Sequence, residues 1–253
     1  MSRSSGHGAF CRQLLISLMQ SCVNEKTMAY YPIFLELKGK KILVVGGGQV
    51  AERKIEALLD CGAEIKIVSL KLTDKLHKIV ENHGLHYLQE EFQEKYLDGV
   101  FLVIAATDDR SLNHKISTTA QEKGLLINAV DQPPDCNFIV PSIVKKGDLQ
   151  IAISTSGKSP ALARKLREQL DSQFGDEYKD FLVLMGLLRK EILSKGLSQK
   201  ENSRIFHEIV ESDILEALAR NDRERVESIV SRNFPNRAVL EECLKSLMNR
   251  KST

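Results

Sequence analysis

The feature that most constrains the fold of this chain is a glycine-rich turn between an apolar run and a helix-like run, in the segment 41–54, KILVVGGGQVAERK. Gly46, Gly48 and Ala51 match the pattern G-x-G-x-x-G/A. In that pattern the first residue permits the turn, the second lets the backbone approach a pyrophosphate, and the third permits close packing of helix on strand. Free N–H groups and the helix dipole at the start of the helix favour phosphates. The segment therefore predicts a dinucleotide-binding turn, and the alternative is a tight turn with a purely structural role.

Strand and helix patterns alternate through the first half of the sequence. Predicted strands lie near 41–46, 64–69, 86–90, 99–107 and 125–131, and predicted helices near 49–61, 73–82 and 110–123. This alternation predicts right-handed βαβ crossovers and an α/β fold, a Rossmann-type doubly wound parallel sheet. Ligands of such sheets bind at the carboxyl ends of the strands. We therefore expect one crevice to be formed by residues 46–50, 69–71, 106–108 and Asp131.

The pattern changes after the strand that ends at Asp131. Two β-like runs at 138–144 and 149–154 flank a hairpin connection at 145–148, and helical patterns follow at 161–174, 178–193, 200–218, 223–229 and 237–249. A two-stranded module is too small to bury its apolar faces alone, so we expect a homodimer. The predicted domains are a Rossmann domain over 29–137, a small β dimerisation segment over 138–158 and a C-terminal helical region over 159–253.

Composition excludes several classes of function. Charged residues make up 28% of the chain but the formal net charge is +2, so no overall field favours nucleic acid or a membrane surface. No apolar run approaches the roughly 20 residues that span a bilayer. The five cysteines are scattered without a C-x-x-C pair, which indicates a reducing cytoplasm.

We expect residues 1–28 to be a disordered extension, because polar residues surround a short apolar patch there and Met28 stands just before the first organised segment.

A second anion-binding candidate lies at the start of a predicted helix. Ser159 can cap the free N–H groups of that helix, and Pro160 suits its first position. Lys158 precedes the cap, and Arg164 and Arg167 follow it. A helix N-terminus with nearby cations favours carboxylates or phosphates. A capped surface helix with solvated charges explains the same residues equally well.

Three groups of segments together resemble the precorrin-2 dehydrogenase family, which includes the dehydrogenase/ferrochelatase part of siroheme synthases. The first group is 31–37 with 44–54, the second is 105–109 with Asn113, 128–131 and 136–142, and the third is 153–164. The resemblance covers about 30–195. It implies NAD-dependent oxidation of precorrin-2 to sirohydrochlorin on the route to siroheme, and in some members the insertion of ferrous iron. It also implies a Rossmann domain, a β dimerisation segment and C-terminal helices.

Asp131 is the candidate catalytic base. Removing a hydride from a carbon framework must be matched by the loss of a proton, so the reaction needs a positioned base. Asp131 follows an apolar strand at the ligand-binding edge and occupies the position of the family's catalytic aspartate, in a motif of the Asn-Val-Val-Asp type that reads NAVD here. The alternative is that it caps the turn at Pro133 and Pro134.

The expected cofactor contacts follow the strand ends: Gly46, Gly48, Gln49, Val50, Ser69, Leu70, Lys71, Thr107 and Asp108. An NAD site usually carries an acidic residue about 20 positions after the glycine motif. This chain has Ser69, Leu70 and Lys71 in that region. Because Lys71 would tolerate a 2′-phosphate, the choice of NAD over NADP rests on the resemblance. Asp108 and Asp109 are expected to cap the following helix and to line the crevice.

The implied substrate bears eight carboxylates, which Lys158, Ser159, Arg164 and Arg167 suit. One position departs from the family pattern, because Thr155 stands where siroheme synthases carry a serine that is reported as modified. The chain is also too short for the methyltransferase domain of those fusions, so another protein is expected to methylate uroporphyrinogen.

The histidines show no metal-ligand spacing, so no structural metal site is predicted, and chelatase activity stays open because iron would be a substrate. The alternative function is a non-enzymatic NAD sensor, since a fold alone does not determine chemistry.

Overall fold

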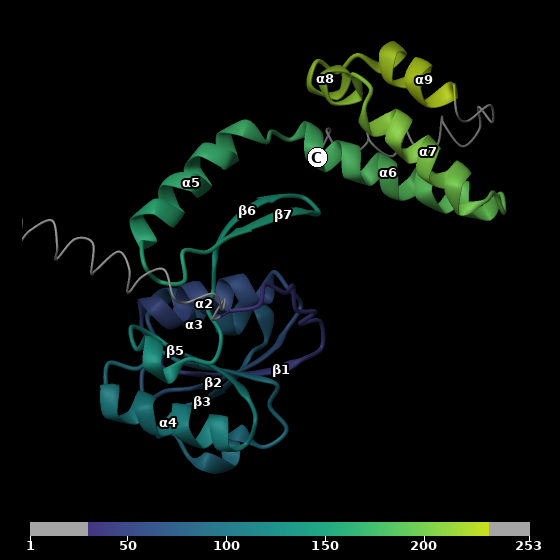
Figure 1. Cartoon of the computed structure of the whole chain (residues 1–253). Coiled ribbons are helices and arrows are strands. Elements are labelled where there is room, and N and C mark those ends of the chain that lie inside the picture. Colours follow the sequence, from purple (N-terminus) through teal and green to yellow (C-terminus); the bar gives the residue numbers. More distant parts are fainter. Residues whose placement is uncertain (1–29, 233–253) are drawn as a thin grey trace, which may run out of the picture. The chain divides into compact units, whose positions relative to one another are not determined.

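A computed structural model of the chain describes residues 30–232, which divide into two compact units after Ile139 (Figure 1). The extension predicted over 1–28 and the helix predicted near 237–249 lie outside the described residues. None of the helices within 30–232 has the length and apolar character needed to cross a bilayer.

The first unit is built on a five-stranded parallel sheet with the strand order β3-β2-β1-β4-β5. The strands are β1 Lys41–Val45, β2 Glu64–Val68, β3 His86–Leu88, β4 Leu102–Ala105 and β5 Leu126–Ala129. The chain runs outward from β1 to β3 and then crosses back to place β4 on the other side of β1. The predicted Rossmann-type sheet is therefore confirmed, and its topological switch point lies between β1 and β4, where doubly wound sheets bind ligands.

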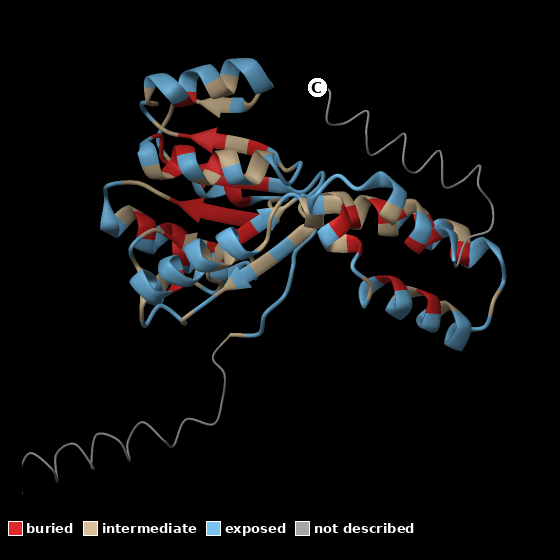
Figure 2. Ribbon diagram, turned by 90° about the horizontal axis from the view of Figure 1, so that it is seen from above, coloured by how far each residue is buried: buried red, intermediate tan, exposed pale blue. Residues whose placement is uncertain are grey.

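Helices cover both faces of this sheet, with α2 Gln49–Leu59 and α3 Asp74–His83 on one face and α4 Arg110–Glu122 on the other (Figure 1). The short 3₁₀ turns η1 Glu94–Leu97 and η2 Pro133–Asp135 were not predicted. Successive residues of β1 point to opposite faces, so Ile42 packs in the cluster that contains Ile55 of α2, and Leu43 packs in the cluster that contains Ile116 of α4. The central strands are accordingly buried in Figure 2.

The free edge of β5 is covered by the segment that follows η2. Asn137 donates its backbone N–H to the Ile127 carbonyl (3.1 Å), and its side-chain oxygen accepts from the Ile127 N–H (2.8 Å). Its side-chain amide also donates to the Leu125 carbonyl (2.8 Å), and the amide of Asn128 donates to the Phe138 carbonyl (3.2 Å). The edge groups of β5 thus have partners without a sixth strand.

This docking corrects the predicted first hairpin strand. The run 138–144 was expected to be a strand, but β6 spans Ser142–Lys146, because Phe138 is engaged at the edge of β5. The second strand, β7 Leu149–Ile153, pairs with β6 in antiparallel register up to Lys146 and Leu149. The connection predicted at 145–148 is therefore the two-residue turn 147–148.

As far as residue 232, the second unit contains this hairpin and five helices: α5 Pro160–Gln173, α6 Glu177–Ser194, α7 Gln199–Val210, α8 Ile214–Ala219 and α9 Arg223–Ser231. The single helix predicted over 200–218 is two helices. The Ser212 hydroxyl donates to the Ile209 carbonyl (2.6 Å), and Asp213 accepts two hydrogen bonds of 2.7 Å from Arg225. These contacts fix a turn between α7 and α8, which periodicity alone does not indicate.

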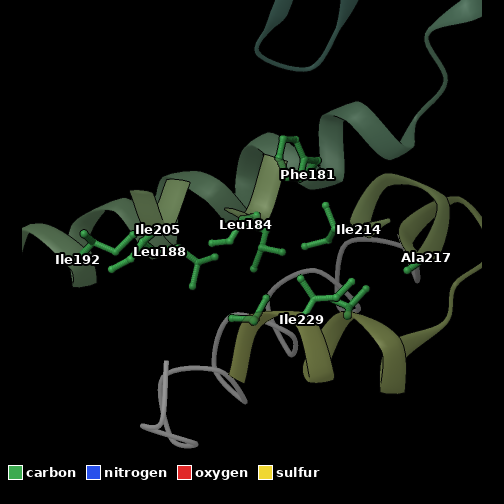
Figure 3. Packing of buried hydrophobic residues seen from close by; sticks show 11 residues of the cluster. Phe181, Leu184, Leu188, Ile192, Ile205, Ile214, Ala217 and Ile229 are labelled. Carbon is green, nitrogen blue, oxygen red and sulfur yellow. The ribbon is translucent and has the colours of Figure 1, made fainter. Parts of the chain in front are cut away.

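Helices α6 to α9 share one apolar core (Figure 3). The side chains of α6 at positions 181, 184, 188 and 192 recur every three or four residues and are buried along one face of that helix. They pack with residues of α7, α8 and α9, including Ile205, Ile214 and Ile229. The second unit thus has a hydrophobic core of its own.

Leu188→Ala should destabilise the second unit by about 2–5 kcal/mol, because it removes a fully buried side chain and leaves a cavity. Leu193→Ala on the same helix should change the free energy of unfolding by less than about 0.5 kcal/mol, since that side chain is 54% exposed. Urea unfolding followed by far-UV circular dichroism measures both losses. Equal losses for the two variants would contradict the packing described for α6.

Candidate functional site

A pocket of about 770 Å³ lies at the carboxyl ends of the central strands. Residues 45–48, 68–73, 90–92, 106–109 and Leu112 line it. The volume falls in the usual range for ligand and cofactor sites. Most of the predicted cofactor contacts lie here: Gly46, Gly48, Ser69, Leu70, Lys71, Thr107 and Asp108. Gln49 and Val50 form the start of α2 and are not among the lining residues, and neither is Asp131.

The glycine turn is required by two close backbone approaches. Gly46 has a φ of +120°, and a Cβ atom there would lie 2.2 Å from the Ala106 carbonyl oxygen. A Cβ atom on Gly47 would lie 2.0 Å from the Lys71 carbonyl oxygen. At Gly48, in contrast, nothing lies within 4 Å of the added atom. The first two glycines therefore serve the fold, while the third leaves open space at the N-terminus of α2.

This open space fits a dinucleotide. Gly48 precedes α2 without a side-chain cap, so the first N–H groups of the helix have no partner there and can face phosphate oxygens. Ala51 of the motif is fully buried against the sheet, as the third small residue of the fingerprint should be.

Gly46→Ala and Gly48→Ala should have different effects. Gly46→Ala should lower the thermal midpoint, because the strained backbone alone costs about 1–3 kcal/mol and the new methyl group meets the Ala106 carbonyl. Gly48→Ala should leave the thermal midpoint unchanged and weaken dinucleotide binding at least about tenfold, or about 1.4 kcal/mol, by occupying the phosphate space. Circular dichroism melting and isothermal titration distinguish the two. Undiminished dinucleotide binding in Gly48→Ala would contradict this assignment.

A polar network ties the glycine turn to the loop after β2. The Thr73 N–H donates to the Gly47 carbonyl (3.0 Å), and the Thr73 hydroxyl donates to Glu52 of α2 (2.8 Å). The other oxygen of Glu52 lies 3.0 Å from the Lys75 ammonium. Hydrogen bonds from Lys75 and then from Thr73 lower the pKa of Glu52 below its ordinary value. The network therefore holds the glycine turn and the loop after β2 together while Glu52 is ionised.

The lowered pKa of Glu52 predicts a defined response to acid. Its contribution to stability is present above its ordinary pKa of about 4.5 and is lost as the pH falls through the lower folded value. Glu52→Gln lacks this contribution, so between pH 6 and pH 3 the wild type should lose more stability than the variant. Urea midpoints across that range provide the measurement, and parallel losses would exclude the network as a source of acid sensitivity.

The loop after β4 is positioned by a buried amide. The Thr107 N–H and hydroxyl both donate to the side-chain oxygen of Asn113 (3.2 and 2.7 Å), and the Asn113 amide donates to the Thr107 carbonyl (2.9 Å). Asn113 is almost fully buried in α4. Asp109 caps α4 by accepting from the N–H groups of Ser111 (2.8 Å) and Leu112 (3.1 Å). The helix cap was expected from the sequence, whereas the positioning role of Asn113 required the structure.

Asp131 lies just after β5, at the carboxyl edge of the sheet, and is exposed. Its φ of +58° is in the left-handed region, which aspartate tolerates better than most residues and which is common at functional sites. Within residues 30–232 no hydrogen bond involves its side chain, and the cap position of η2 belongs to Gln132. The structure therefore does not use Asp131 to cap the Pro133 turn.

The turn beside Asp131 is fastened to α4. The Gln132 side-chain amide donates to one oxygen of Asp135 (2.7 Å), and His114 Nδ1 lies 2.7 Å from the other oxygen. The Ser117 hydroxyl donates to the Asp135 carbonyl (2.6 Å). His114 therefore holds this turn. Across residues 30–232 no three histidine, cysteine or carboxylate side chains are grouped to hold a metal ion.

The predicted substrate-binding residues belong to the second unit. The Ser159 hydroxyl caps α5 by accepting from the Leu162 N–H (3.3 Å). Arg164 and Arg167 both contact Glu168 (2.9 and 3.3 Å), and Arg164 contributes most to lowering the pKa of that carboxyl. Lys158 is exposed in the loop before the cap. The helix start is thus as predicted, and its role toward a substrate remains a prediction.

The fold, the glycine turn and the pocket at the switch point define a dinucleotide-binding Rossmann protein. Residues 33–142 match the family model described as "Putative NAD(P)-binding", and residues 146–173 match that of the sirohaem biosynthesis protein central region. The chain is 40% identical to the siroheme synthase of Photorhabdus laumondii over 181 residues, which cover 72% of this chain and 38% of that protein. It is 48% identical to siroheme synthase 1 of Serratia proteamaculans over 145 residues, which cover 57% and 30%.

A solved structure of SirC, precorrin-2 dehydrogenase, superimposes with a TM-score of 0.67 and 28% identity, covering 80% of this chain and all of that one. The chain therefore resembles precorrin-2 dehydrogenase and the dehydrogenase part of siroheme synthases in both sequence and fold. It spans less than half the length of the siroheme synthases that it matches. The predicted nicotinamide cofactor is supported at the level of NAD(P).

Proposed function

We propose that this chain oxidises precorrin-2 to sirohydrochlorin with NAD as the hydride acceptor, in the biosynthesis of siroheme. The observation that carries the proposal is the likeness to SirC, precorrin-2 dehydrogenase, over the whole length of that protein. The pocket at the switch point supports it, because its glycine turn and the uncapped start of α2 suit a pyrophosphate.

The chemistry assigned to the chain is proton removal and positioning. When bound, the cofactor supplies a nicotinamide ring that accepts hydride from the substrate. Gly46, Gly48 and Thr107 would hold it. Asp131 takes up the proton that leaves the substrate, so that two hydrogens are lost in all. Its exposed carboxylate has no hydrogen bond to another described residue that would compete for this role. The contacts of Asp135 with Gln132 and His114 hold the turn that follows it.

Three further parts of the proposal concern the assembly, the location and iron. A homodimer is supported by the hairpin, whose outer face leaves Ile143 44% exposed while Val144 is buried on the inner face. The cytoplasmic location predicted from the cysteines stays a prediction. Iron insertion into sirohydrochlorin is a separate activity, in which iron is a substrate.

Asp131→Asn should reduce turnover by about 10²–10⁴-fold, because the amide cannot accept the proton, and should leave NAD affinity unchanged. Anaerobic oxidation of enzymatically generated precorrin-2, followed by the sirohydrochlorin absorption, measures the rate, and isothermal titration measures the affinity. Asp98→Asn, at an exposed surface pair with Lys123, is the matched control and should retain full activity.

Wild-type activity in Asp131→Asn would remove this residue from the mechanism. Absence of turnover in the wild type with either NAD or NADP, despite binding, would favour the alternative of a non-enzymatic NAD sensor. Ferrous iron added to the product then tests insertion, which is present if the protein accelerates the loss of the sirohydrochlorin spectrum.

A further inference from the structure

The pocket lacks the acidic residue that usually follows β2 in an NAD site. After Val68 the chain continues with Ser69, Leu70 and Lys71, all of which line the pocket. The Ser69 hydroxyl is engaged with the Lys71 carbonyl (2.7 Å), and the Leu70 side chain is 56% exposed. A carboxylate that could meet the adenosine ribose is therefore not provided by this loop.

The neighbouring strand brings carboxylates to the same edge. Because β3 is parallel to β2, with Leu88 opposite Val68, the residues that follow the two strands emerge side by side. The Ser69 N–H donates to the Leu88 carbonyl (3.2 Å), which fixes that register at the strand ends. Glu90 and Glu91 follow β3 after Gln89, and both line the pocket. The loop after β3 thus supplies the charge that the loop after β2 lacks.

Glu90 is held in place by residues of the turn that follows it. The Gln93 side-chain amide donates to a Glu90 oxygen (3.2 Å). Glu90 also faces the hydroxyl of Tyr96, a core residue only 7% exposed, and it raises the pKa of Tyr96 to about 12. Glu90 is half-buried, while Glu91 and Lys71 are exposed. A half-buried carboxylate with a fixed orientation interacts with a ligand charge more strongly than an exposed flexible lysine does.

The balance of charge in the pocket also disfavours a ligand with an additional phosphate. Its lining residues include one lysine, Lys71, against the four carboxylates Glu90, Glu91, Asp108 and Asp109. A ribose hydroxyl can donate a hydrogen bond to a carboxylate, whereas a 2′-phosphate adds negative charge and can only accept. The walls therefore favour a dinucleotide with a free 2′-hydroxyl.

We propose that Glu90, in the loop after β3, is the residue that makes this pocket select NAD over NADP, in place of the missing acid after β2. The inference deepens the proposed function and rests on its dinucleotide site. Gln93 and Tyr96 act as positioning residues, because they hold the carboxylate and do not line the pocket themselves.

The test measures the dissociation constants of NAD and NADP directly, by isothermal titration of the full chain without substrate. Glu90→Gln keeps the shape of the side chain and removes its charge, so the ratio of the NADP constant to the NAD constant should fall about tenfold, or about 1.4 kcal/mol. Glu81→Gln, on the exposed surface of α3, is the matched control and should leave the ratio unchanged. Tyr96→Phe retains the Glu90 charge but removes its hydroxyl partner, and should lower the ratio by a smaller factor.

A ratio unchanged in Glu90→Gln would overturn the inference, as would a wild type that prefers NADP. A lowered ratio in a protein that does not oxidise precorrin-2 would support the role of Glu90 and reject the proposed reaction. Turnover of precorrin-2 with a ratio unchanged in Glu90→Gln would support the proposed reaction and reject the role of Glu90. Failure of the inference and failure of the proposed function are therefore distinguishable.

Discussion

The structure of the first unit depends on the close contact between the ends of three strands at its switch point. Gly46 lies against the carbonyl after β4, and Gly47 lies against the loop after β2. The same contact brings the loops after β1, β2 and β4 around one pocket. Any side chain at these two positions would separate the strand ends. The absence of two Cβ atoms therefore determines both how the sheet edge packs and where a ligand can enter.

Around this contact, polar side chains hold the loops of the pocket through hydrogen bonds that the backbone alone does not supply. Asn113 forms hydrogen bonds with the backbone and the hydroxyl of Thr107. Glu52 links α2 to Thr73 at the start of α3. Each of these side chains is buried or nearly so, which makes its hydrogen bonds stronger and their loss more costly. The pocket walls are thus shaped before any cofactor binds, which reduces the ordering cost of binding.

Local sequence patterns predicted most of the fold, because the periods of strand and helix and the glycine motif are local signals. Where the prediction was wrong, distant residues decide the outcome. The start of β6 depends on Phe138 docking at β5, and the break between α7 and α8 depends on the pair formed by Asp213 and Arg225. In the site, the contribution of Glu90 depends on the pairing of β2 with β3, since no motif marks the loop that carries it.

The segment that covers the free edge of β5 affects how molecules of this protein can associate. A parallel sheet with an open side can recruit a strand from another chain, which is a common route to aggregation. Here Asn137 blocks one side with a side-chain amide, and on the other side β3 is only three residues long and presents little backbone to pair with. The width of the sheet is thereby limited at both edges, and strand addition to this sheet is disfavoured as a mode of association.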